Sequence, residues 1–166
     1  MGGMNLERLD KNKIYKMSFR KGVTFNPLSW LGWLIRLIAN VKYNHTGVLY
    51  YSGCWMLQEA IGDGVISQPL KESNAWNYYT HYSIEESENK KALFQRIAEI
   101  EGFKYDFVGL LFFQLWLNLF DKWIGSAVHD GKKYYCYESV AYVFDIDEKK
   151  PSEINKHFII IYEGTI

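Results

Sequence analysis

The fold is decided by residues 43–64, which read YNHTGVLYYSGCWMLQEAIGDG. Two predicted strands, HTGVLY at 45–50 and CWMLQEA at 54–60, flank a short loop that ends in Gly53. Glycine has no steric penalty at positive φ, and such a residue commonly closes a three-residue hairpin loop. The stretch therefore predicts a β-hairpin.

The loop length sets the register of this hairpin. A three-residue loop places Tyr50 opposite Cys54, and His45 then lies opposite Glu59. A slip of one residue would turn His45 and Glu59 to opposite faces of the sheet. The register therefore predicts that an imidazole and a carboxylate face each other.

The remaining elements are recognised by hydrophobic periodicity and by turn residues. They are strands at 13–19, 65–70, 78–84 and 157–162, and helices at 28–39, 87–101, 107–124 and 136–145. Helices and antiparallel strands mixed in such blocks predict an α+β fold. No repeat or linker divides the chain, so a single domain over 1–166 is expected.

Composition excludes several classes of protein. Hydrophobic residues make up 48% and charged residues 23%, which is typical of a globular rather than a disordered chain. Lys plus Arg and Asp plus Glu number 19 each, and no basic stripe follows a helix, so nucleic acid is not expected as a partner. With no apparent secretory signal and only two cysteines, a cytoplasmic, reducing setting is expected.

Cys136 is the strongest candidate nucleophile. The surrounding sequence, KKYYCYESVAYVFD, predicts a helix that begins near the cysteine. A helix N-terminus brings partial positive charge and free N–H groups to the sulfur, which favours the thiolate and can bind an oxyanion. The spacing alone leaves open the alternative of a buried cysteine that packs as a small hydrophobic residue.

His45 and Glu59 are the candidates for its catalytic partners. A neutral imidazole can take the thiol proton, and a carboxylate opposite it can hold the second ring nitrogen. A surface histidine and an ordinary exposed glutamate are the open alternatives. Cys54 has no helix start beside it and is interpreted as structural. Because the cysteines and histidines form no close ligand pair, no metal and no cofactor is expected.

Four short blocks occur in an order that a known family shares. They are YNHTGV at 43–48, QEAIGDGV at 58–65 with PL at 69–70, GFKYDF at 102–107 and YCYESVA at 135–141. In order and spacing they resemble the permuted NlpC-type papain-like superfamily, in its YiiX-like branch, which is related more distantly to lecithin retinol acyltransferase. In that branch the histidine strand precedes the cysteine helix, the reverse of papain order.

The resemblance implies a circularly permuted papain-like fold, in which an antiparallel sheet or small barrel packs against helices that include the cysteine helix. It implies Cys136 as nucleophile, His45 as base and Glu59 as the third polar residue. The sequence departs from the family at Tyr137, which replaces the usual serine after the cysteine. This change could alter the mouth of the site or its substrate preference.

Three further features complete the prediction. Tyr105 matches a tyrosine that lies near the site in the family, with a core position as the alternative. Glu138 is expected to cap or support the cysteine helix. The apolar run 107–124 carries a polar stripe, which favours a buried amphipathic helix over a membrane span, while contact with a membrane surface or lipid remains open.

Together these features predict a cysteine hydrolase or acyltransferase. It would act on an amide or ester bond through a Cys-His-Glu triad and a thioacyl intermediate. The expected substrate is a small-molecule, peptide or lipid-like acyl group, and the aromatic content of 17% favours an apolar one. The alternative, from a different class, is a non-catalytic module that binds a hydrophobic ligand on the same fold.

Overall fold

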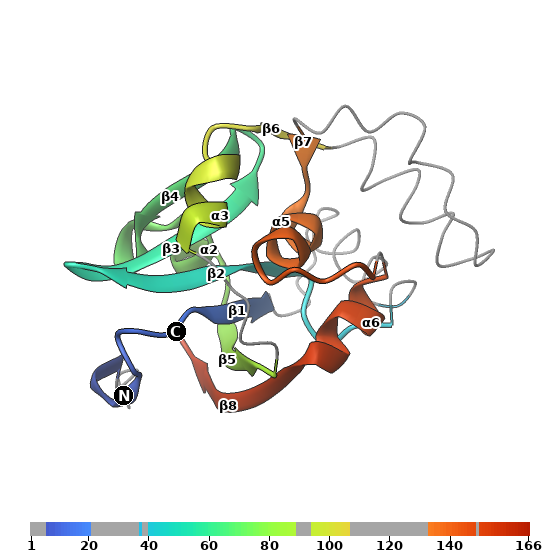
Figure 1. Ribbon diagram of the computed structural model, residues 1–166. Helices are drawn as coiled ribbons and strands as arrows, with labels where there is room; N and C mark the ends of the chain where they lie inside the picture. The colour runs from blue at the N-terminus through green and yellow to red at the C-terminus, as the bar shows by residue number, and fades with distance from the viewer. Residues whose placement is uncertain (1–5, 21–36, 38–39, 89–93, 107–132, 149) are drawn as a thin grey trace.

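The computed structural model describes residues 6–20, 37, 40–88, 94–106, 133–148 and 150–166. Within them the protein has an α+β fold built on a six-stranded antiparallel sheet (Figure 1). The strands of this sheet are β1 (Tyr15–Arg20), β2 (His45–Ser52), β3 (Cys54–Ile61), β4 (Gly64–Pro69), β5 (His81–Ser87) and β8 (Phe158–Thr165). The helices are α2 (Asn74–Tyr78), α3 (Phe94–Ile100), α5 (Cys136–Val143) and α6 (Pro151–Ile154). A short parallel pair joins β6 (Lys104–Tyr105) to β7 (Lys133–Tyr134).

The strands of the main sheet are ordered β4-β3-β2-β1-β5-β8. β2 and β3 form the predicted hairpin, but the turn is tighter than predicted because the strands meet around Gly53 alone, at φ 75°. Gly47, not His45, therefore lies opposite Glu59, and the predicted register was wrong by two residues. A shift of two residues preserves the alternation of side chains, so His45 and Glu59 still share a face.

Most other predicted elements are confirmed within a few residues, and the strand predicted at 78–84 needs the largest correction. Its first residue, Tyr78, is the last residue of α2, residues 79–80 connect the two elements, and β5 begins only at His81. Ser73 caps α2 by accepting a hydrogen bond from the Trp76 N–H at 2.9 Å. An N-cap serine starts a helix even before an aromatic run with high strand propensity.

Part of the prediction falls outside the described residues. This applies to helix 107–124 and, apart from Leu37, to helix 28–39. The start predicted for helix 87–101 was wrong, because Ser87 is the last residue of β5; helix α3 is described from Phe94. Among the described helices, none has the length and apolar character needed to cross a membrane.

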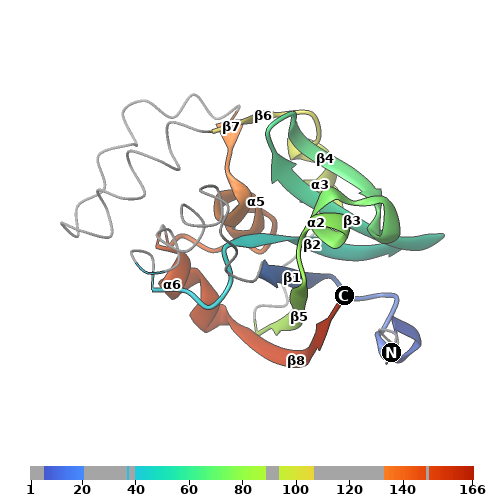
Figure 2. The ribbon, with the colours of Figure 1, turned by 180° about the vertical axis from the view of Figure 1, so that it is seen from behind.

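Helices α3 and α5 lie on one face of the sheet and α2 lies on the other (Figures 1 and 2). Because side chains alternate along a strand, each face contributes its own core. Val48 packs with Val140 of α5 on the first face, whereas Leu49 and Leu57 pack near Ala75 of α2 on the second. This two-sided packing fixes the ends of β2 and α5, where the candidate site lies.

Candidate active site

His45 and Glu59 form a buried pair at the end of the β2–β3 hairpin. The Nε2 atom of His45 lies 2.8 Å from Oε2 of Glu59, and the two residues are 8% and 0% exposed. Since Glu59 lies opposite Gly47, its carboxylate reaches His45 diagonally across the two strands. The pair predicted from the hairpin therefore forms, through a diagonal contact rather than a directly opposed one.

A neighbouring strand holds the other oxygen of the carboxylate. Gln68, near the end of β4, donates from Nε2 to Oε1 of Glu59 at 3.1 Å. Both oxygens of Glu59 are thus engaged, which fixes the orientation of the carboxylate toward His45. Gln68 was not predicted as a site residue, because its contact depends on the pairing of β3 with β4.

Cys136, which is far from His45 in the sequence, approaches the same imidazole. It is the first residue of α5, as predicted, and is 4% exposed. Its side chain interacts with the His45 imidazole and contributes to raising the pKa of that group. Because Nε2 of His45 faces Glu59, Nδ1 is the ring nitrogen left for the sulfur. Each of the two residues begins its own element, so the contact forms where the start of α5 meets the start of β2.

The charge state of His45 follows from these two contacts. Burial alone would lower the pKa of the imidazole, but the hydrogen bonds to Cys136 and Glu59 and the negative charges of both groups oppose it. The net result raises the pKa of His45 from 6.5 to about 9. The imidazolium, held between two acidic groups, is therefore the favoured form at neutral pH.

A cavity of about 270 Å³ opens beside His45 and Glu59. The rest of its lining is apolar or aromatic and includes Ile61, Tyr79 and Tyr105. Tyr105 therefore lies near the site, as expected from the resemblance. Among the described residues no lysine or arginine lines the cavity, and its two ionisable partners, His45 and Glu59, are engaged with each other, so it suits a neutral, apolar group better than a charged one.

Tyr79 is a site residue that the sequence did not reveal. Its ring stacks on the His45 imidazole, with centroids 5.5 Å apart and planes inclined by 6°. Burial raises the pKa of its hydroxyl, with the charges of Cys136 and Glu59 contributing in the same direction. In the sequence it is one of several tyrosines in an aromatic run, and only its position after α2 brings it to His45.

Tyr137 and Glu138 flank the site without lining the cavity beside His45. Tyr137 is 4% exposed and donates from its hydroxyl to the carbonyl of Tyr43 at 3.0 Å. The residue that departs from the family pattern thus points into the interior. Glu138 accepts a long hydrogen bond from the Tyr135 N–H at 3.4 Å, which is the capping role expected for it.

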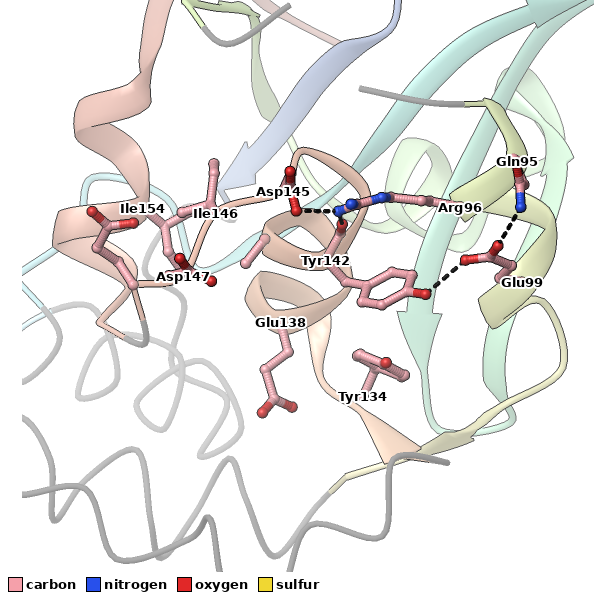
Figure 3. A pocket seen from close by; sticks show the side chains of 12 residues that line it. Gln95, Arg96, Glu99, Tyr134, Glu138, Tyr142, Asp145, Ile146, Asp147 and Ile154 are labelled. Carbon is pink, nitrogen blue, oxygen red and sulfur yellow. Dashed lines mark hydrogen bonds and ion pairs between the residues drawn. The ribbon is translucent and has the colours of Figure 1, made fainter. Parts of the chain in front are cut away.

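A larger cavity of about 520 Å³ borders α3 and α5 (Figure 3). Its lining is rich in acids, including Glu138 and Glu99, and is crossed by an ion pair of 2.7 Å between Arg96 and Asp145. No cysteine or histidine is among the described residues that line it. His45 and Glu59 line the smaller cavity, whereas the buried Cys136 is not among the described residues that line either cavity.

The other cysteine has a different environment. Cys54 is exposed at the tip of the hairpin, and both cysteines are free thiols. No group of three histidines, cysteines or acids that could hold a metal occurs in the part of the chain described by the structure.

No protein-family profile matches the chain, and a search of curated proteins gives no significant match. The function is therefore argued from the geometry of the site.

Proposed function

We propose that this protein is a cysteine hydrolase or acyltransferase on a circularly permuted papain-like fold. The observation that carries the proposal is the position of His45 between Cys136 and Glu59. A thiol, an imidazole and an orienting carboxylate in this order form the arrangement used for nucleophilic catalysis. The start of α5 adds backbone N–H groups beside the sulfur.

In the proposed reaction the Cys136 thiolate attacks the carbonyl carbon of an amide or ester, and a carbon–sulfur bond forms. The carbonyl electrons move onto oxygen, where N–H groups of the first turn of α5 stabilise them. The tetrahedral intermediate collapses, and His45 gives its proton to the departing amine or alcohol. His45 then takes a proton from water or an acceptor hydroxyl, which attacks the thioester and releases Cys136.

Glu59 and Tyr79 would act on the imidazole rather than on the substrate. Glu59 keeps Nε2 of His45 engaged so that the other nitrogen faces the sulfur. Tyr79 stacks on the ring and limits its rotation. The apolar lining of the cavity favours a substrate whose acyl group is uncharged, such as a lipid-like acyl group.

The test compares the two cysteines in the folded protein. A thiol-reactive probe applied at about pH 6 should label the wild type and Cys54→Ala but not Cys136→Ala, because an ordinary thiol is almost fully protonated there. A panel of peptide, ester and lipid acyl donors then identifies the bond that is cleaved. If Cys136 reacts with the pH profile of an ordinary thiol, near pH 8.5, the proposal is wrong.

A binding module for a hydrophobic ligand is the second candidate. The apolar and aromatic lining of the 270 Å³ cavity favours it, since such a lining binds an uncharged group without turnover. Native mass spectrometry of the purified protein distinguishes the two. A co-purified apolar ligand together with an unreactive Cys136 would support binding, whereas an acyl group covalently attached to Cys136 would support catalysis.

A further inference from the structure

Lys16 and Glu85 form a buried ion pair that the proposed chemistry does not use. Lys16 on β1 is 1% exposed, Glu85 on β5 is 4% exposed, and the two residues are directly opposite in the register of these strands. Neither residue lines the cavity beside His45. Burying an ion pair costs desolvation energy that its attraction often fails to recover, so its presence needs a reason other than stability.

The pair has further hydrogen-bond partners among buried or partly buried side chains. The Nζ of Lys16 donates to Glu85 and, at 2.8 Å, to Oδ1 of Asn155, and Ser83 donates to the other oxygen of Glu85 at 2.7 Å. The same Nζ lies 5.9 Å from the centre of the Tyr137 ring. The ammonium group therefore faces the first turn of α5.

Tyr137 connects this pair to both halves of the candidate site. It follows Cys136 directly, and its hydroxyl donates to the carbonyl of Tyr43, two residues before His45. Its hydroxyl also interacts with Asn155, the residue that accepts from Lys16. One side chain thus ties the start of α5 to the start of β2.

We propose that the Lys16–Glu85 pair and Tyr137 form a positioning unit that holds the first turn of α5 where Cys136 meets His45. The unit touches no substrate and acts through the helix that carries the nucleophile. This inference rests on the proposed function, because it concerns the reactivity of the Cys136 thiolate. It also gives Tyr137 a role: the tyrosine ring reaches the buried pair, which the serine usual in the family is too short to do.

The reactivity of Cys136 reports on this position, because its pH profile depends on every charge around the sulfur. The described titratable groups that face Cys136 or its nearest partners are Lys16 on β1, His45 on β2, Glu59 on β3, Glu85 on β5, Tyr79, Tyr105 on β6, Tyr135, and Tyr137 on α5. Of these groups, Lys16 and Glu85 carry charge yet do not line the cavity beside His45, so the pair can be removed without changing the imidazole or the cavity lining.

The test replaces both charges together, in a background that carries Cys54→Ala. The double variant Lys16→Met/Glu85→Met leaves no unpaired buried charge and is expected to fold. The rate of Cys136 alkylation is measured from about pH 5 to about pH 9. We expect the rate near pH 6 to fall roughly tenfold, because a displaced thiolate is less well stabilised by the imidazolium. Tyr137→Phe should change the profile in the same direction but less.

The chain offers a matched control on the same two segments. Lys13 and Glu86 form an exposed ion pair of 2.5 Å, so Lys13→Met/Glu86→Met removes the same charges at the surface. Its alkylation profile should match the wild type. Coincident profiles for the folded buried-pair variant and the wild type would overturn the inference. If the double variant does not fold, an unchanged profile in Tyr137→Phe overturns it and a shifted one supports it.

Failure of the proposed function is recognised separately. If wild-type Cys136 already shows the profile of an ordinary thiol, the proposed function is wrong and the positioning role is rejected with it. If the wild type reacts at low pH and the buried-pair variant does so equally, only the positioning role is rejected.

Discussion

At the scale of single residues, the contacts of His45 determine how stability depends on pH. The pKa of His45 is about 9 in the folded protein, against 6.5 for an ordinary histidine. A raised folded pKa means that the charged form stabilises the fold fully below pH 6.5, and that this contribution is lost as the pH rises through about 9.

The first prediction concerns this pH window. The difference in unfolding free energy between the wild type and His45→Gln should decrease from about pH 6 to about pH 9, by an amount on the order of 3 kcal/mol. Urea unfolding at several pH values measures it. In Cys136→Ala the window should move to lower pH, because the strongest interaction that raises the pKa of His45 is gone. A difference that is independent of pH would contradict this account.

The second prediction separates the two partners of the imidazole. His45→Ala should abolish the reactivity of Cys136 near neutral pH, because no imidazolium remains to stabilise the thiolate. Glu59→Gln should reduce turnover yet preserve more of the alkylation rate, because the histidine remains but loses its orienting carboxylate. Alkylation kinetics and acyl-donor turnover are measured in parallel. Equal and negligible effects of the two substitutions would count against the triad.

At the scale of elements, the β2–β3 hairpin positions the pair. Gly47 lies opposite Glu59, and a Cβ atom at this position would sit 2.5 Å from the backbone oxygen of Gln58. The hairpin can pair in its observed register only because residue 47 has no side chain. The glycine at the turn, Gly53, has a different constraint: its φ is 75°, but a Cβ there would meet open space.

The third prediction compares these two glycines. Gly47→Ala should destabilise the protein by about 2–3 kcal/mol, because backbone must move to relieve the clash. Gly53→Ala should cost only about 1 kcal/mol, the strain of a left-handed residue. Thermal unfolding measures both. Gly47→Ala should also lower the pKa of His45, whereas Gly53→Ala should not. An NMR titration of the imidazole measures this pKa in each variant. Equal effects on the imidazole would exclude a specific role for Gly47.

At the scale of the whole molecule, the two cores flank one sheet and should unfold together. Leu57 is buried on the α2 side and Val140 on the α5 side, both at 0% exposure. Because the strands of the sheet are shared, loss of either core removes a surface on which the other packs.

The fourth prediction tests this cooperation. Leu57→Ala should cost about 2–5 kcal/mol and Val140→Ala somewhat less, since fewer buried atoms are removed. Each substitution should shift one unfolding transition, seen identically by far-UV and near-UV circular dichroism. The expectation of a single domain over 1–166 would fail if two transitions appeared and each variant shifted only one.

The sequence by itself determined the local elements and the face of the hairpin on which each side chain lies. The odd number of residues in the predicted hairpin loop placed His45 and Glu59 on one face, and the sequence around Cys136 predicted a helix that begins near the cysteine. Local propensity and side-chain alternation are sufficient for these features, because each depends only on neighbours along the chain. The exact register was missed, since loop length alone does not reveal that the strands close around Gly53.

The tertiary structure decided which distant groups meet. Tyr79 stacks on His45, Gln68 holds Glu59, and Lys16 lies beneath Tyr137 only because of how the strands pair and how α5 packs on them. These contacts join residues of different elements, between nine and 121 positions apart, and no local pattern encodes them. The physical reason is that burial on both faces of the sheet fixes long-range geometry, which propensity and spacing cannot specify.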